Sequence, residues 1–126
     1  MNPYDDIEIW ADAYIRVQDA GASLDESHPD YLAAYEFMEK LSGERAEKCW
    51  QGILAVVARR PSEHVLGVLA AGLLEDLLDD SGPQFIERIE EQAQRDPIFK
   101  HMLTGVWRSG SPIVWSKLEA ARDNAS

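Results

Sequence analysis

The chain has 126 residues, and its 23 aspartates and glutamates outnumber its 12 lysines and arginines, which gives a formal net charge of −11 at pH 7. This balance argues against direct binding to a nucleic-acid backbone, because that mode needs clustered basic residues. A hydrophobic content of 45% with four tryptophans excludes disorder through lack of apolar surface, and the length predicts a single domain over residues 1–126.

The single cysteine, Cys49, cannot form an internal disulfide and is typical of a reducing compartment. It stands beside Trp50 in a helical pattern, where we expect a buried, inert thiol, with a reactive one as the alternative. The N-terminus has neither the basic nor the apolar region of a secretory signal. The longest strongly apolar stretch, residues 65–74, is much shorter than the roughly 20 residues that span a bilayer. We therefore expect a cytoplasmic protein without a membrane partner.

The acidic N-terminal segment, residues 1–28, is predicted to form a first helix and a loop. Asn2 and Pro3 are typical of a helix start, with an N-cap followed by proline at the first helical position. Apolar residues then recur every three or four positions, which predicts one buried face formed by Tyr4, Ile7, Trp10, Tyr14 and Val17. The polar, glycine-containing stretch 19–28 is predicted to be a loop.

Apolar periodicity and helix stops predict the next elements. A second helix is expected over residues 29–41 and a third over residues 44–59, before Pro61 prevents continuation. Ser62 is predicted to cap a fourth helix. At Gly72 this helix either ends, with a short fifth helix after it, or continues with a kink.

Three further helix starts are predicted where a proline follows a capping residue by one or two positions: Ser81-Gly82-Pro83, Asp96-Pro97 and Ser111-Pro112. Residues 108–110 read as a turn, and the tail 123–126 is expected to be frayed. No strand pattern is present. The sequence therefore predicts an all-α fold of six to eight short helices in antiparallel hairpins, either an irregular bundle or a short HEAT-like α-solenoid stack.

The C-terminal half carries a recognisable pattern: AAG-x-LEDLL at 70–78, FI-x-RIE at 85–90, RDP at 95–97 and GVW at 105–107. It resembles a family of small bacterial proteins catalogued only as a domain of unknown function. One departure is Leu73, where the family pattern has a proline that opens the next helix. The resemblance implies a fold and brings no activity with it.

The acidic residues are concentrated in two blocks. Residues 1–30 contain eight acids and one base, and residues 75–91 contain seven acids and one base. In the second block the pairs Glu75/Asp79 and Asp76/Asp80 are four residues apart on a helix, where like charges cost a few tenths of a kcal/mol. Such a cluster is typical either of a solvated face or of a surface for a basic partner.

We expect the second block to bind a basic protein surface. All four tryptophans fall on or near an apolar stripe, so core packing is their first interpretation; the alternative is that one of the two beside the turn, Trp107 or Trp115, is an aromatic anchor, and Trp107 is included on that basis. The predicted contact residues are Glu75, Asp76, Asp79, Asp80, Glu87, Glu90, Glu91 and Trp107.

Catalytic chemistry finds little support in the sequence. The serines at 62, 81 and 111 are explained as helix caps, and no phosphate-binding glycine loop is present. His64 and the acids after Gly72 are the only metal-ligand candidates, and they lack a ligand-spacing motif. We therefore expect no catalytic residue, no metal site, no cofactor and no enzyme activity.

These observations favour a non-enzymatic, acidic protein-binding module of bacterial or mobile-element origin. An immunity or inhibitor protein that masks a basic surface is the leading form of this hypothesis. A structural or adaptor domain whose acids only solvate it is the first alternative. A metal-dependent enzyme that uses the carboxylates with His64 is the second.

Overall fold

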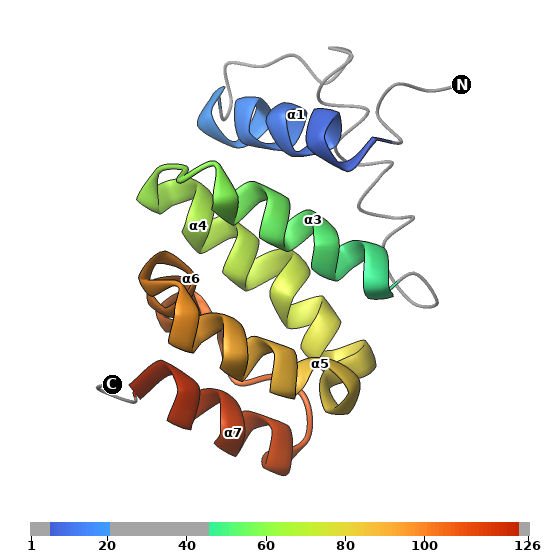
Figure 1. Cartoon of the computed structure of the whole chain (residues 1–126), viewed down its shortest axis with the longest axis vertical. Coiled ribbons are helices and arrows are strands. Elements are labelled where there is room, and N and C mark those ends of the chain that lie inside the picture. The colour runs from blue at the N-terminus through green and yellow to red at the C-terminus, as the bar shows by residue number, and fades with distance from the viewer. Residues whose placement is uncertain (1–5, 21–45, 124–126) are drawn as a thin grey trace.

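The computed structural model describes residues 6–20 and 46–123, and this part of the chain is all-helical. Figure 1 shows α1 at one end of the molecule, α3 and α4 next to it, and α7 at the other end beside α5. The elements in chain order are α1 (Ile7–Ala20), α3 (Ala46–Ala58), α4 (Glu63–Leu69), the π-helical turn η4 (Ala70–Leu74), α5 (Glu75–Arg95), α6 (Pro97–Met102), the 3₁₀ turn η5 (Leu103–Gly105) and α7 (Pro112–Asp123).

The first helix begins later than the sequence predicts. Asp6 lies in a bend before α1, and its Oδ1 accepts hydrogen bonds from the backbone N–H groups of Glu8 at 2.8 Å and Ile9 at 3.2 Å. An aspartate that satisfies these free N–H groups is itself an N-cap, so the prediction of one helix running on from Pro3 is wrong. Asn2 and Pro3 lie outside the described residues. At its other end α1 continues to Ala20, past the predicted start of the loop.

The predicted helix over 29–41 lies outside the described residues. The predicted third helix is confirmed as α3, which ends before Arg60 takes a positive φ of 51° and Pro61 follows. Ser62 then caps α4 as predicted, because its Oγ accepts a hydrogen bond from the N–H of Val65 at 3.3 Å.

Gly72 does not end the helix. It lies in η4, a π-helical turn that joins α4 directly to α5, so the alternative of a continuous but irregular helix is the correct one. The chain bends further on at Ser81, whose φ of −140° and ψ of 26° are not helical. Pro83 lacks the N–H that would bond to the carbonyl of Asp79, which explains a break at this point. The predicted start at Ser81-Gly82-Pro83 is therefore present as a kink within α5.

Both predicted C-terminal helix starts are confirmed. The Asp96 carboxylate accepts a hydrogen bond from the N–H of Ile98 at 3.0 Å, and the Ser111 hydroxyl accepts one from the N–H of Val114 at 3.3 Å. α7 includes Asp123, so the helix extends into the segment predicted to fray. The remaining tail residues lie outside the described part of the chain.

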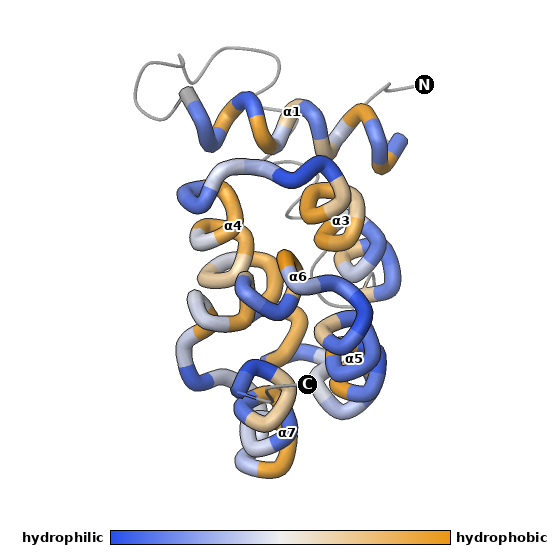
Figure 2. The backbone as a smooth tube through the Cα atoms, turned by 60° about the vertical axis from the view of Figure 1, so that its left-hand side comes forward, coloured by the Kyte–Doolittle hydropathy of each residue, from blue (hydrophilic) through white to orange (hydrophobic). Residues whose placement is uncertain are grey.

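The apolar side chains of these elements form one core, and Figure 2 shows hydrophobic residues concentrated along α3 and α4. Trp50 is 6% exposed and packs between the rings of Phe85 and Phe99, with centroid distances of 6.1 and 5.8 Å. Trp10 is fully buried, as the helical stripe predicts. Within the described ranges, none of the helices has the length and apolar character needed to cross a membrane.

Candidate partner-binding surface

The loop that connects η5 to α7, residues 106–111, is fastened to the first turns of α5. Oε2 of Glu75 accepts a hydrogen bond from the N–H of Trp107 at 3.3 Å. Oδ1 of Asp79 accepts one from the N–H of Gly110 at 2.8 Å. The predicted like-charge pair Glu75/Asp79 therefore binds backbone donors of this loop, which offsets its own repulsion.

Ser109 strengthens the same attachment from inside the loop. It is 7% exposed, and its hydroxyl lies 2.8 Å from the carbonyl oxygen of Trp107 and 3.4 Å from Oε1 of Glu75. Gly110 follows with a φ of 75°, a conformation that favours glycine. The loop is thus held by side chains and by its own backbone geometry, and it keeps Trp107 in a defined place.

The second predicted pair, Asp76/Asp80, lies on another side of the same turns. Both residues are exposed, and Asp80 accepts a hydrogen bond from the Ser81 hydroxyl at 2.8 Å. Their charges also reach Cys49 on α3: burial first, and then the charges of Asp76 and Asp80, raise the pKa of this thiol to about 12. These two carboxylates therefore lie toward α3, whereas Glu75 and Asp79 lie toward the loop.

Trp107 projects from the loop into solvent. It is 76% exposed, although its backbone N–H is held by Glu75. Ile113, at the start of α7, is 72% exposed. We call the group formed by Glu75, Asp76, Asp79, Asp80 and Trp107 the acidic–aromatic surface. A large rigid aromatic side chain beside several carboxylates is suited to a partner that offers both apolar and basic groups.

The other predicted contact residues lie beyond the kink at Ser81. Glu87 and Glu91 are exposed and Glu90 is half-buried. Here basic side chains stand among the acids. Arg88 pairs with Glu47 at 2.6 Å, and Glu91 shares the lining of a hollow of about 180 Å³ with Arg88 and Arg95. The structure thus divides the eight predicted residues into two groups, and only the first group includes the exposed tryptophan.

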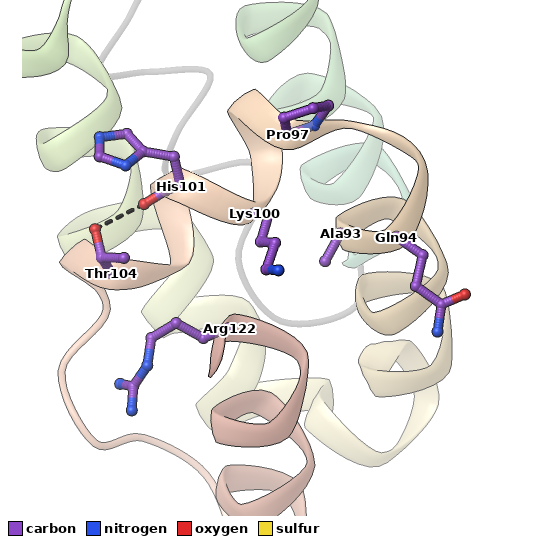
Figure 3. A pocket seen from close by; sticks show the side chains of 7 residues that line it. All are labelled: Ala93, Gln94, Pro97, Lys100, His101, Thr104 and Arg122. Carbon is purple, nitrogen blue, oxygen red and sulfur yellow. Dashed lines mark hydrogen bonds between the residues drawn. The ribbon is translucent and has the colours of Figure 1, made fainter. Parts of the chain in front are cut away.

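Sequence reasoning missed a basic pocket at the opposite end of α5. It has a volume of about 310 Å³ and lies between the end of α5, α6 and the last turn of α7 (Figure 3). Lys100, His101 and Arg122 line it, and among the described residues no acidic side chain does. The sequence signal is a base near the end of each of two helices, and its meaning appears only when the fold brings those helix ends together.

The described residues show no side-chain arrangement that supports the catalytic or the metal-binding alternative. Cys49 is buried, as expected, and burial together with nearby carboxylates raises its pKa to about 12, which keeps the thiol protonated near neutral pH. His64 is exposed. In the described ranges no three side chains of histidine, cysteine, aspartate or glutamate gather closely enough to hold a metal ion.

Comparison with known proteins shows the family. The model of a family of unknown function, DUF6869, matches residues 21–126, so the chain belongs to this family. This confirms the expected membership of a family of unknown function. No curated protein and no solved structure matches the chain.

Proposed function

For this member of DUF6869 we propose a non-enzymatic role in which the acidic–aromatic surface binds a basic surface of another protein. The observation that carries the proposal is Trp107, which is 76% exposed on a loop held in place by Glu75 and Asp79. Tryptophan is enriched among the residues that anchor protein interfaces.

Charge supports the same assignment. The net charge of −11 attracts cationic partners over a distance, and such attraction raises association rates. Asp76 and Asp80 supply exposed carboxylates on the same turns of α5, on the side toward α3, while Glu75 and Asp79 fix the loop that carries the anchor. We assign recognition of basic side chains to the first pair and positioning of Trp107 to the second.

The biological form that best fits this chemistry is an immunity or inhibitor protein. Such a protein of a bacterium or mobile element acts in the cytoplasm by covering a basic functional surface of its target. We also propose that the whole chain forms six to eight helices stacked as in a short HEAT-like solenoid. This arrangement would leave the loops at the ends of the helices available for a partner.

The test is capture of partners from a bacterial lysate by the wild type, Trp107→Ala and the double variant Asp76→Asn/Asp80→Asn, read by mass spectrometry. Ile9→Ala serves as the matched control, because Ile9 is an exposed apolar residue of α1, at the far end of the molecule (Figure 1). A basic protein retained by the wild type and the control, and lost by both surface variants, is the expected result.

The captured protein is then titrated at rising salt. Binding that weakens steeply with salt supports electrostatic recognition, since exposed charges are screened over about 8 Å at physiological ionic strength. A partner captured equally by all variants contradicts the proposed surface. Capture of no partner by the wild type favours the structural-domain alternative, and a metal that copurifies on the acids with His64 would favour the enzyme.

A further inference from the structure

The basic pocket stands out against the charge of the chain. Residues 95–122 contain five basic and two acidic residues, although the whole chain carries −11. Lys100 and His101 reach the pocket from the last turn of α6, and Arg122 reaches it from the last turn of α7 (Figure 3). Exposed charges more than about 8 Å away, the Debye length at physiological ionic strength, are largely screened and affect the pocket weakly.

The space exists because its apolar lining is short. Ala93 and Pro97 line it with small side chains, and the volume of about 310 Å³ lies at the lower end of small-molecule sites. Thr104 contributes a hydroxyl whose proton is donated to the carbonyl oxygen of His101 at 2.7 Å. The pocket therefore offers two cationic side chains, Lys100 and Arg122, and room for a molecule larger than a simple ion. Its third basic residue, His101, has its Nε2 2.7 Å from Oε1 of Glu63.

Arg122 is oriented but not saturated. Its Nε and Nη2 donate to the two carboxylate oxygens of Asp123 at 2.8 and 3.1 Å, and its guanidinium lies 5.9 Å from the ring centroid of Trp115. Its Nη1 donates no hydrogen bond to any residue in the described ranges. Nη2 also lies 3.9 Å from Oε2 of Glu119. A guanidinium held along this edge keeps the donors of Nη1 for a further oxyanion.

Asp123 shows which kind of group the two cations attract. The hydrogen bond from Arg122 is the main cause that lowers the pKa of this carboxyl, and the charge of Lys100 contributes as well. The carboxylate is exposed and stands at the C-terminal end of α7, where the helix dipole disfavours negative charge. The chain thus places its own anion beside both cations.

From this geometry we infer that the pocket binds a phosphate group, either free or carried by a small organic molecule, through Lys100 and Arg122. Two cations match a dianion better than a monoanion, and arginine presents paired donors to phosphate oxygens. In this arrangement Asp123 competes with the ligand for Arg122. The site is distinct from the acidic–aromatic surface, and its test does not depend on a protein partner.

The test is a titration of the full chain with inorganic phosphate, ribose 5-phosphate, ribose and acetate at constant ionic strength. Binding is followed by the NMR signals of the Lys100 and Thr104 amides and of the Arg122 Nε–H. We expect saturable shifts with the two phosphates and none with ribose or acetate. Tighter binding of ribose 5-phosphate identifies an organic phosphate as the ligand type, and equal binding identifies free phosphate. Equal response to acetate, or no saturable shift with either phosphate, overturns the inference.

Four variants sharpen the result. Arg122→Gln and Lys100→Gln should each weaken phosphate binding about tenfold or more, because each removes a charge-assisted contact. Asp123→Asn should strengthen it, because the competing carboxylate is gone. Lys117→Gln is the matched control, since Lys117 is an exposed lysine of α7 outside the pocket. An effect of Lys117→Gln equal to that of Arg122→Gln, or weaker binding in Asp123→Asn, contradicts the site.

Discussion

At the scale of single residues, several acidic side chains form hydrogen bonds and ion pairs with other residues of the same chain. Arg59 donates hydrogen bonds to Asp12 and Glu8 at 2.6 Å each, and to the carbonyl oxygen of Ala55 at 2.8 Å. These contacts, first the hydrogen bond to Asp12, raise the pKa of Arg59 and join α1 to the end of α3. Arg59 thus combines a contact with a carbonyl at the C-terminal end of α3 with ion pairs to α1.

Cys49 provides a first prediction at this scale. Because burial and two nearby carboxylates hold its pKa at about 12, we expect almost no reaction with a thiol reagent such as DTNB at pH 8 in the native protein. In denaturant the same reagent should titrate one thiol for each chain. Rapid labelling without denaturant would show that the thiol is accessible and contradict its placement in the core.

Gly110 provides a second prediction at the scale of single residues. Its φ is 75°, and an added Cβ would stand 3.0 Å from the carbonyl oxygen of Leu78, so Gly110→Ala should lower the free energy of unfolding by about 1–2 kcal/mol or more. Gly67→Ala is the matched control. An added Cβ at Gly67 meets nothing within 4 Å, and alanine in a helix should raise stability by about 0.5–1 kcal/mol. Urea unfolding of both variants checks the opposite signs.

At the scale of elements, capping residues determine where the helices begin. Asp6, Ser62, Asp96 and Ser111 each accept a hydrogen bond from a backbone N–H at a helix start. Three of these starts follow from the sequence, because a serine or aspartate stands at a break in the apolar pattern. The first does not, because Asn2-Pro3 and Asp6 are both good local signals and only one can begin the helix.

Asp96 connects an element start to the rest of the fold. Besides capping α6, it accepts hydrogen bonds from Nη1 of Arg60 at 2.8 and 2.9 Å. Asp96→Ala removes the cap and leaves Arg60 without this acceptor, so we expect a loss of about 1–2 kcal/mol in urea unfolding. Asp96→Asn keeps a good capping side chain and should lose less. Equal losses in the two variants would show that the ion pair, and not the cap, carries the effect.

At the scale of the whole molecule, two tryptophans differ sharply in exposure. Trp50 is 6% exposed between Phe85 and Phe99, whereas Trp107 is 76% exposed. Trp50→Ala should therefore reduce stability by about 3–5 kcal/mol, because it removes a buried ring and leaves a cavity. Trp107→Ala should stay within about 0.5 kcal/mol of the wild type. Thermal and urea unfolding measure both, and a fully stable Trp50→Ala variant would show that this core is wrongly placed.

The candidate surface was only partly predictable from the sequence. The acids 75–80 and Trp107 are visible as a charge block and as an aromatic residue beside a turn, so both could be named in advance. That Asp79 binds the N–H of Gly110, 31 residues away, is a long-range contact that local patterns do not contain. Glu75 and Asp79 therefore position the loop. The charge pattern of the sequence alone does not show whether an acidic residue has this role or binds a partner.

The sequence by itself determined the helical class, most helix starts and the buried faces. These features depend on apolar spacing, capping side chains and proline, which act over a few neighbouring residues. Only the tertiary structure decided that α4 continues through a π turn into α5, that Trp107 remains in solvent, and that Lys100 and Arg122 share a pocket. Those outcomes depend on how distant helices pack and on the space their side chains leave, and no local pattern encodes that geometry.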